Sequence, residues 1–388
     1  MRQRDRLPTC AFCERFHAHD IFCRVRLGTC IVLELAVAAG AVGGVSIGVS
    51  TVATHAGDYL AAREADAATL ADPPDRLEQP QPLPRSHLPL TFVVAQDNVY
   101  GAPDAELLAP LGTSRITGMK LNRGGTSLSI RVDFATGGRA SFKPEQIHPQ
   151  SDPRREIAAF KIDRLLGIGH VPPAKETELP LQELLDAAEP GFRAYITSRV
   201  LDEATIRDGK LRGELSWWIP DIKLAKIGNH RVDEHDGRDI WTTYLQVGAR
   251  IPPGMRDMLA QLSALILFDV LIDNADRWTG SNTEMSPDGK ILYFMDNTLS
   301  FSIMKFGHEH NAGAMRRIQV FPRKLVQRLR ELTLEQVQKT LETDPNSKLG
   351  PLLRPEEISA IIARRDNMLR YIDQLIERYG EDAVLAFP

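Results

Sequence analysis

The chain has 388 residues, of which 25% are charged and 6% are aromatic, and its formal net charge at pH 7 is −4. This length exceeds the roughly 250–300 residues at which a single hydrophobic core stops growing, so we expect two lobes with appended segments. The near-neutral charge balance excludes a strongly basic nucleic-acid-binding protein, and we expect no nucleic-acid partner. The abundance of Ala, Arg and Asp is typical of GC-rich bacterial genomes, and it predicts a bacterial source.

The N-terminal thirty residues differ in composition from the rest of the chain. They contain all four cysteines, which are Cys10, Cys13, Cys23 and Cys30. Cys10 and Cys13 have the spacing of a metal-binding pair, but no second pair follows at the distance of a zinc ribbon. Because this segment is also rich in arginine, we interpret residues 1–30 as a basic cytoplasmic tail.

An uncharged stretch of Ala, Val, Gly and Ser covers residues 35–54 and has about the 20-residue length needed to span a bilayer. Arginines precede it and mainly acidic residues follow it. The positive-inside rule therefore places the N-terminus in the cytoplasm and the bulk of the chain outside. We predict a single-pass transmembrane signal anchor over residues 31–56, which puts the protein in a membrane with its C-terminal domain extracytoplasmic. A signal peptide cleaved near Ala56 and a buried Ala-rich helix are the alternatives, and the long basic region favours the anchor.

A linker and the first lobe are predicted next. Residues 57–89 are rich in Pro, Ala and Asp, which is typical of a flexible to extended linker. We expect the folded part to begin near Leu90, with a β-rich N-lobe over residues 90–205 and a helical C-lobe over residues 206–388. No cysteine lies in either lobe, so neither depends on a disulfide.

Strand patterning dominates residues 116–142. Residues 127–134 alternate polar and apolar side chains, and a glycine turn at 136–138 reverses the chain to form a hairpin. Ahead of this hairpin, Gly125 and Thr126 belong to a second glycine turn. The backbone amides of such a turn are able to approach a phosphate, although a glycine pair is more often only a turn.

Lys143 and Glu156 follow the hairpin, and the role of Glu156 has two interpretations. Lys143 ends the last strand of the hairpin, and Asp152 and Pro153 begin a helix that continues through Arg164. Glu156 lies in the first turn of this helix, where an acid complements the helix dipole. Alternatively, Glu156 holds Lys143, which is the usual device for positioning nucleotide phosphates. The residues alone leave both interpretations open.

The middle of the chain is less regular in pattern. Residues 194–201 predict a strand that leads into a hinge between the lobes, and residues 202–250 predict an irregular insertion or a surface that faces the acceptor. Residues 255–272 form a long apolar run that predicts the central helix of the C-lobe. Three further helical patterns follow, at 321–332, 334–341 and 355–379.

Two acidic loops lie twenty residues apart after the apolar helix. Asp276 lies in the first loop, and Asp296 directly follows the strand-like residues 291–295. In-line phosphoryl transfer requires an oriented hydroxyl and a divalent metal that gathers charge on the phosphates. Two carboxylates at the ends of rigid elements provide both, and together with Lys143 and Glu156 they stand in the chain order that a kinase requires.

These segments resemble the secretory-pathway atypical kinases, a family that includes the Golgi casein kinase and the four-jointed kinases. Residues 156–166, followed by Val171, Pro172 and Pro173, are similar to the helix that carries the lysine partner in this family. The preceding strands match without a gap, and the two acidic loops are similar to the four-jointed catalytic and metal loops. The resemblance covers residues 112–335 with gaps in the middle.

The resemblance implies an α+β, two-lobed atypical protein-kinase-like fold, with a β-rich N-lobe and a helical C-lobe behind the membrane anchor. It implies that Lys143 contacts the nucleotide phosphates and that Glu156 holds Lys143 and helps to hold metal. It further implies that Asp276 orients the acceptor hydroxyl and that Asp296 binds the metal. The implied cofactor is ATP with Mg²⁺ or Mn²⁺, and the implied acceptors are proteins or glycans.

Further candidates and departures from the family lie beside these four residues. Gly125, Thr126 and Ser127 are the remaining candidates for contact with the nucleotide, and Asn282 is a third candidate for the metal. Ser281 stands five residues after Asp276, where many kinases place a second metal or nucleotide contact. The family also includes a pseudokinase, so the fold alone does not establish turnover.

Three functions therefore fit the sequence. We favour a metal-dependent phosphotransferase that moves the γ-phosphate of ATP to a Ser or Thr hydroxyl of a protein or to a glycan. A lipid kinase of the phosphatidylinositol type has similar acidic loops and suits a membrane anchor. A catalytically weak pseudokinase scaffold is the third, since Ser127, Ser129 and Ser281 depart from the family pattern and ATP is scarce outside a bacterial inner membrane.

Overall fold

The computed structural model describes residues 98–122, 127–278 and 282–388. The chain divides into two units, Met1–Pro89 and Leu90–Pro388, and all described residues lie in the second unit. The predicted tail, anchor and linker, together with Gly125, Thr126 and Ser281, lie outside the described residues. Among those that are described, no helix is both long enough and apolar enough to cross a membrane.

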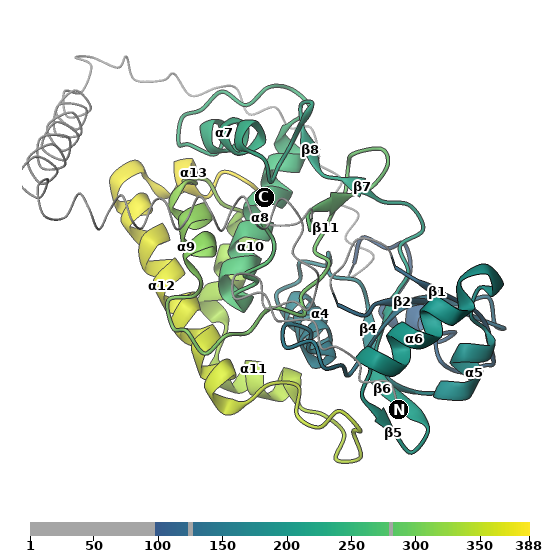
Figure 1. The fold of residues 1–388 in the computed structure, drawn as a ribbon. Helices are drawn as coiled ribbons and strands as arrows, with labels where there is room; N and C mark the ends of the chain where they lie inside the picture. The colour runs from purple at the N-terminus through teal and green to yellow at the C-terminus, as the bar shows by residue number, and fades with distance from the viewer. Residues whose placement is uncertain (1–97, 123–126, 279–281) are drawn as a thin grey trace, which may run out of the picture. The chain divides into compact units, whose positions relative to one another are not determined.

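An antiparallel sheet forms the first lobe (Figure 1). Its strands run in the order β1-β2-β3-β6-β4, and β5 pairs with β6. Their bounds are β1 Ile116–Leu121, β2 Ile130–Phe134, β3 Arg139–Pro144, β4 Ala174–Pro180, β5 Ile206–Arg207 and β6 Lys210–Trp217. The predicted hairpin is confirmed by β2 and β3, which pair Ile130 with Phe142 across a turn where Gly137 has a φ of +84°.

The structure corrects the prediction that residues 202–250 are irregular. β6 lies between β3 and β4, and it alternates buried apolar side chains such as Leu211 and Leu215 with polar ones on its other face. Gly213 allows the close approach to β3, because a Cβ there would lie 2.2 Å from the carbonyl oxygen of Lys143. The sheet therefore continues past residue 205, the predicted end of the N-lobe.

Helices α5 (Leu181–Asp186) and α6 (Arg193–Glu203) cover one face of this sheet. The predicted strand at 194–201 is wrong, because this segment is the body of α6. Its β-branched residues favoured a strand, but Ile196 and Val200 are four residues apart and form one buried helical stripe. Together with Phe142 and Leu215 they build the apolar core of the first lobe.

Helix α4 (Pro153–Leu165) lies between the sheet and the helical lobe (Figure 1). It begins as predicted, since the Asp152 side chain accepts a hydrogen bond from the backbone amide of Arg154 and Pro153 occupies the first turn. Ile157 and Ile162 pack into the core of the second lobe. Glu156 is therefore fixed at the junction of the two lobes.

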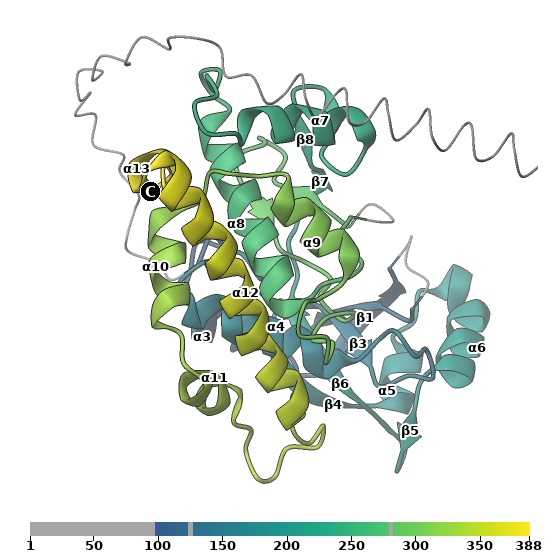
Figure 2. The same ribbon diagram turned by 90° about the vertical axis from the view of Figure 1, so that its left-hand side faces the viewer.

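The second lobe is mainly helical and is built around α8 (Arg256–Ile272), which confirms the predicted central helix (Figure 2). The other three helical predictions are confirmed by α10 (Arg323–Glu331), α11 (Leu334–Leu341) and α12 (Pro355–Tyr379). The remaining elements are short: α3 Asp104–Leu108, η1 Pro190–Phe192, α7 His235–Tyr244, α9 Glu309–Arg316, α13 Glu381–Val384, β7 Lys223–Leu224, β8 Lys226–Ile227, β9 His230–Arg231, β10 Glu284–Met285 and β11 Leu292–Tyr293.

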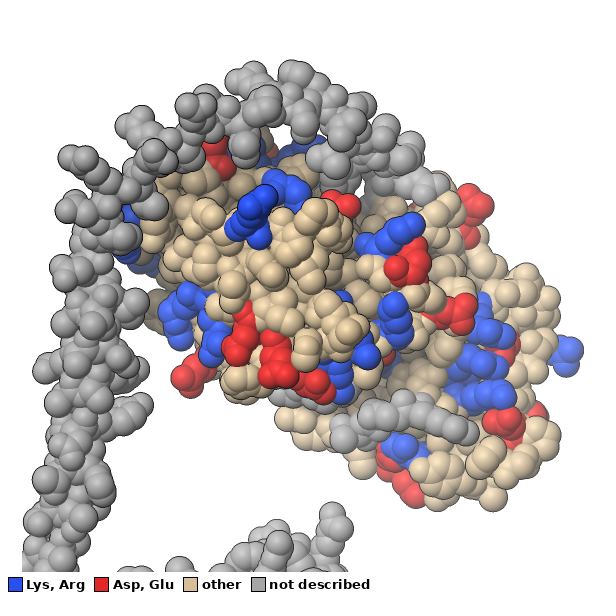
Figure 3. Space-filling model, turned by 90° about the horizontal axis from the view of Figure 1, so that it is seen from above, with Lys and Arg blue, Asp and Glu red and all other residues tan. Residues whose placement is uncertain are grey.

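Charged side chains of both signs are interspersed on the face seen in Figure 3. Lysines and arginines lie beside aspartates and glutamates there rather than in one separate basic patch. This face therefore lacks the single-sign field that concentrates an oppositely charged polymer.

His170 connects the segment between α4 and β4 to β11. Its Nδ1 lies 2.6 Å from the carbonyl oxygen of Leu292, and its own carbonyl oxygen accepts hydrogen bonds from the Phe294 amide and the Tyr100 hydroxyl. The pKa of His170 is lowered to about 4, mainly by burial; the Leu292 carbonyl opposes this shift and nearby Arg164 adds to it. The imidazole is therefore neutral at pH 7.

Acidification is expected to destabilise the protein through His170. The unfolded chain takes up the proton near pH 6.5 and the folded chain only near pH 4, so stability falls as pH decreases between these values. The full effect is about 3 kcal/mol, at about 1.36 kcal/mol for each pKa unit. Urea unfolding at pH 7 and pH 4.5 measures it. The variant His170→Gln is expected to lose less stability on acidification than the wild type, and equal losses would contradict this assignment.

Candidate active site

The two predicted acidic loops lie against each other in the structure. Helix α8 ends at Asp273, whose left-handed φ of 57° turns the chain into the first loop. The amide of Asn274 in this loop donates hydrogen bonds to the backbone oxygen of Asp296 at 3.0 Å and to Oδ1 of Asn297 at 3.2 Å. Asn274 is fully buried. The spacing of the two loops is thus set by a buried side chain rather than by solvent-exposed contacts.

Arg277 joins both loops to helix α8. Its guanidinium is fully buried, and its Nε lies 3.0 Å from Oδ2 of Asp269 on the helix. It also donates to Oδ1 of Asn297 at 2.9 Å, to the backbone oxygen of Asn282 at 2.9 Å and to that of Met295. One side chain therefore fixes the backbone on both sides of the site.

Asn297 extends this network to helix α4. Its backbone amide donates to Oε2 of Glu156 at 2.7 Å, and its side-chain amide donates to Oε1 of Glu156 at 2.9 Å. Glu156 is only 3% exposed, so both of its oxygens are engaged in a buried contact. Asn297, the residue after Asp296, therefore positions Glu156. This contact was not predicted from the sequence.

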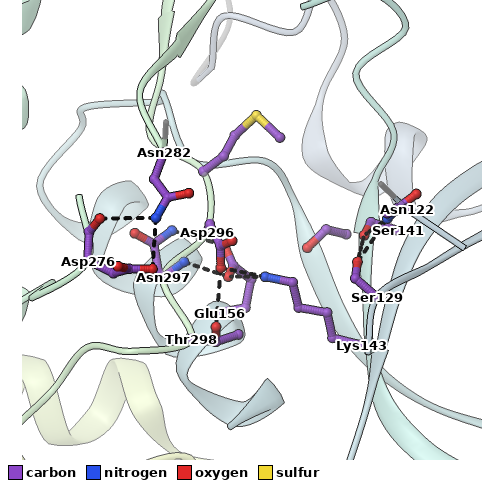
Figure 4. A network of polar contacts seen from close by, with 12 residues as sticks. Asn122, Ser129, Ser141, Lys143, Glu156, Asp276, Asn282, Asp296, Asn297 and Thr298 are labelled. Carbon is purple, nitrogen blue, oxygen red and sulfur yellow. Dashed lines mark hydrogen bonds and ion pairs between the residues drawn. The ribbon is translucent and has the colours of Figure 1, made fainter. Parts of the chain in front are cut away.

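Lys143 reaches both of the carboxylates with which the sequence associated it (Figure 4). Its Nζ lies 2.7 Å from Oδ1 of Asp296 and 3.8 Å from Oε2 of Glu156. Burial alone would lower the pKa of Lys143, but Asp296, Glu156 and Glu214 together raise it above its usual value. In turn, the Lys143 ammonium lowers the pKa of Asp296. Lys143 is therefore charged and positioned at the Asp296 carboxylate.

Asp276 is oriented by a residue of the same loop. The side-chain amide of Asn282 donates to Oδ2 of Asp276 at 2.7 Å and to its backbone oxygen at 3.0 Å, as Figure 4 shows. The backbone amide of Asp276 also donates to Oδ1 of Asn274. Both contacts are made by the amide nitrogen of Asn282 rather than by its side-chain oxygen. Asp276 is partly exposed, as a group that meets an acceptor must be.

Two further carboxylates near the site were not predicted. Glu214 on β6 is directly opposite Lys143 in the sheet and is 1% exposed, with Oε2 accepting from the Ser216 hydroxyl at 2.8 Å. Burial, and then Glu156, raises the pKa of Glu214 well above its ordinary value. Burial and then Asp296 raise the pKa of Glu284 to about 7. The period-two alternation of β6 was the signal that would have placed Glu214 beside Lys143.

The oxygen-bearing side chains at the site fit a divalent cation that is also coordinated by phosphate. Among the described residues there is no group of three or more His, Cys, Asp or Glu side chains arranged to hold a metal. Mg²⁺ and similar ions are usually held by one or two carboxylates together with substrate phosphates rather than by a complete protein cage. Asp296 suits this role because its side chain is 48% exposed. Glu156 suits it less, since both of its oxygens are bonded to Asn297.

A small polar cluster lies on the sheet close to Lys143. The side-chain amide of Asn122 donates to the hydroxyls of Ser129 and Ser141, at 2.8 and 3.2 Å (Figure 4). Ser141 is two residues before Lys143 on β3, so both side chains face the same side of the sheet. Ser127, one of the nucleotide candidates, is half-buried and follows residues 123–126, which are outside the described residues.

Unusual backbone conformations gather in these loops. Of the described non-glycine residues with positive φ, Asp273, Asp296 and Phe301 all lie within thirty residues of each other around the site. Such conformations cost of order 1–3 kcal/mol each and persist where surrounding contacts enforce them. Here the hydrogen bonds of Asn274 and Asn297 hold the backbone of the two loops in place.

Comparisons with known proteins identify relatives of one kind. No model of a known protein family matches the chain. It is 23% identical to the human "Extracellular serine/threonine protein kinase FAM20C" over 324 residues. The matched region covers 72% of this chain and 55% of that protein. It is 25% identical over 333 residues to the mouse "Pseudokinase FAM20A", covering 74% and 60%. The chain thus spans little more than half the length of these relatives.

Solved structures show the same fold. The crystal structure of the Golgi casein kinase superposes with a TM-score of 0.59 at 20% identity, covering 74% of this chain and 79% of that one. The structure of hydra Fam20 with sugar gives 0.55 at 20% identity, covering 71% and 90%. The two-lobed, kinase-like α+β fold and the resemblance to the Golgi casein kinase family are confirmed. Human, mouse and hydra relatives give no support to the expected bacterial source.

Proposed function

We propose that this relative of the Golgi casein kinase is a metal-dependent phosphotransferase that moves the γ-phosphate of ATP to a hydroxyl of a protein or glycan. The observation that carries the proposal is the convergence of Lys143, Glu156, Asp276 and Asp296 at the junction of the two lobes. A charged lysine, a partly exposed acid and a metal-loop carboxylate meet there. These are the groups that phosphoryl transfer requires.

Each residue has a distinct proposed role. Asp276 accepts a hydrogen bond from the acceptor hydroxyl and takes its proton as the acceptor oxygen bonds to the γ-phosphorus and the bond from that phosphorus to the leaving ADP breaks. Asn282 holds Asp276 in position. Lys143 binds the phosphates of the nucleotide and is retained by Glu156. Asp296 holds Mg²⁺ or Mn²⁺, which when bound neutralises charge on the phosphates. Asn282 would contribute an oxygen to the same ion.

Support for ATP and a divalent metal comes from the relatives as well as from the site. One solved structure with this fold is the Golgi casein kinase with Mn/ADP bound, at a TM-score of 0.57 and 20% identity. In this chain, the carboxylates of Asp296 and Glu156 both lie beside the single Lys143 ammonium, and they supply the negative potential that attracts a divalent cation. Glu156 is proposed mainly as a positioning residue, and its role as a metal ligand stays a prediction.

The nucleotide candidates Gly125, Thr126 and Ser127 precede the hairpin that carries Lys143. They are proposed to contact phosphate through backbone amides. We also propose that the lobes meet after Trp217, where the sheet ends, rather than at residue 205. Residues 31–56 are proposed as a single-pass anchor with the kinase-like unit outside the cytoplasm, on the basis of their uncharged composition and the preceding arginines.

A pseudokinase scaffold is the second candidate function. The similarity to a mouse pseudokinase, at 25% identity, is comparable to that to the human kinase. In this structure Lys143 is also nearer to Asp296 than to Glu156, and that contact engages the carboxylate proposed for the metal. A scaffold would bind nucleotide without transferring its phosphate.

The variant Asp276→Asn tests the proposed function. Asparagine keeps the shape of the side chain and accepts the Asn282 hydrogen bond, but it takes no proton. Phosphoryl transfer is therefore expected to fall by about 10²–10⁴-fold, the usual contribution of a general base. The measurement is the rate of label transfer from γ-labelled ATP with Mn²⁺. Thermal stabilisation by nucleotide is expected to be unchanged, and an unaltered transfer rate would remove Asp276 from the proposed role.

A further inference from the structure

The loop that follows the metal loop exposes three large apolar side chains. Ile303, Met304 and Phe306 are 58%, 45% and 78% exposed. Large exposed apolar groups on a monomer often mark a binding surface when they are contiguous. These three lie within four positions of one another, and we name them the apolar tip.

The backbone of this loop is held firmly although its side chains are exposed. Arg364 on α12 is 1% exposed, and its Nη1 donates to the backbone oxygens of Ser302 at 2.9 Å and Met304 at 2.8 Å. Asn367 on the same helix donates to the backbone oxygen of Lys305 at 2.9 Å. The exposure of the apolar tip is therefore a feature of an ordered loop.

A second anchor places the loop beside the proposed catalytic residue. The buried carboxylate of Asp273 accepts hydrogen bonds from the His308 amide at 2.6 Å and from the Ser302 hydroxyl. A Cβ at Gly307 would lie 2.9 Å from Oδ1 of Asp273, so the loop packs directly on this residue. Asp273 is only three residues before Asp276. The backbone amide of Ala275 also donates to the carbonyl oxygen of Leu299 at 3.4 Å, so the segment that leads into the apolar tip runs beside the loop that carries Asp276. An extended acceptor chain bound at Asp276 can therefore reach this segment.

The size and charge of the surface favour a short polypeptide segment as its occupant. The exposed area of three such side chains is on the order of 300 Å², compared with roughly 800 Å² for each partner in a stable protein dimer. Peripheral membrane surfaces combine apolar groups with clusters of Lys and Arg, whereas Lys305 is the only such residue from Phe301 to His308. The occupant expected from chemistry and location is the acceptor itself.

The geometry points to the apolar tip as an acceptor-docking surface that selects polypeptides with an apolar side chain a few residues from the phosphorylated Ser or Thr. This inference rests on the proposed function and specifies its substrate class. Phe306 contributes most, since it is the most exposed of the three. Arg364 and Asp273 are positioning residues, because they act through the backbone of the loop.

An array of Ser-centred peptides with one fixed flanking residue tests the inference on the full-length chain. Both binding without nucleotide and incorporation of labelled phosphate are scored. The wild type is expected to prefer Leu, Ile or Phe at one flanking position. Because an apolar contact in a pocket is typically worth about tenfold or more in discrimination, Phe306→Ser is expected to reduce this preference by about tenfold. Phe306→Leu is expected to retain it.

Phe192→Ser is the matched control, since Phe192 is also exposed but lies at the start of α6 on the other lobe. It is expected to leave the preference intact. Equal binding of all peptides by the wild type, or an unchanged preference in Phe306→Ser, would overturn the inference. Absence of phosphate incorporation with the binding preference intact would instead contradict the proposed function and support the docking surface.

Discussion

Replacing Asp296 by Asn is expected to lower metal-dependent phosphoryl transfer by about 10³-fold or more, because the carboxylate that we propose as the ligand of the divalent ion loses its charge. A metal bound to a transferring phosphate stabilises the transition state by several kcal/mol, and each 1.36 kcal/mol or so corresponds to about tenfold in rate. The fold is expected to persist. Asp296 is half-exposed and has a φ of 56°, a left-handed conformation that asparagine also tolerates.

The measurement is the transfer rate as a function of Mn²⁺ concentration, beside the melting temperature of the ligand-free protein. Asp288→Asn is the matched control, since Asp288 lies at the exposed turn between β10 and β11 and the change is chemically identical. The control is expected to keep the wild-type rate. Activity of Asp296→Asn close to wild type would show that the metal is held elsewhere.

Replacing Arg277 by Met is expected to destabilise the folded protein by about 3–5 kcal/mol, the usual effect of removing one partner from a buried ion pair. Asp269 is 1% exposed and would lose its guanidinium partner. Burial already raises its pKa to about 6 against the opposing effect of Arg277, so in the variant its carboxyl group would be protonated and left without this hydrogen-bond donor. The hydrogen bonds to Asn297 and to the backbone of both loops would also be lost. Nucleotide turnover is therefore expected to be lost together with stability.

Urea unfolding at pH 7 measures this difference in free energy. The comparison is Arg330→Met, which removes an arginine from the exposed pair with Asp373. Exposed pairs contribute about 0–1 kcal/mol, so this control is expected to change stability little. If both variants lose the same small amount of unfolding free energy, Arg277 is not the centre of the network described above.

The parts of the fold that the sequence predicted are those with an unambiguous period. The apolar run of α8 and the hairpin of β2 and β3 were predicted correctly, because burial alone decides their pattern. Segment 194–201 was predicted as a strand because β-branched side chains favour strands, but its packing against the sheet makes it part of α6. β6 was missed because Gly213 interrupts the apolar face of its alternating pattern.

The candidate site was predicted to a similar extent. Lys143, Glu156 and Asp296 converge as the chain order indicated, and Asp276 lies in the adjoining loop. The supporting residues were not predicted, because Asn297 and Glu214 act through contacts between segments that are distant in sequence. Asn297 lies in a loop, where no periodic pattern predicts its contacts, and Glu214 follows only once β6 is recognised as a strand. Only the packing of α4 against both lobes brings them together.

The most direct test of the account is the incubation of the full-length chain with γ-labelled ATP and either Mg²⁺ or Mn²⁺, with and without a chelator. The account predicts metal-dependent formation of ADP, and transfer of label to the protein itself or to an added acceptor, both abolished by the chelator. Label in added phosphatidylinositol rather than in protein or glycan would establish the lipid kinase. Thermal stabilisation by nucleotide without any turnover under either metal would contradict the phosphotransferase and establish the scaffold.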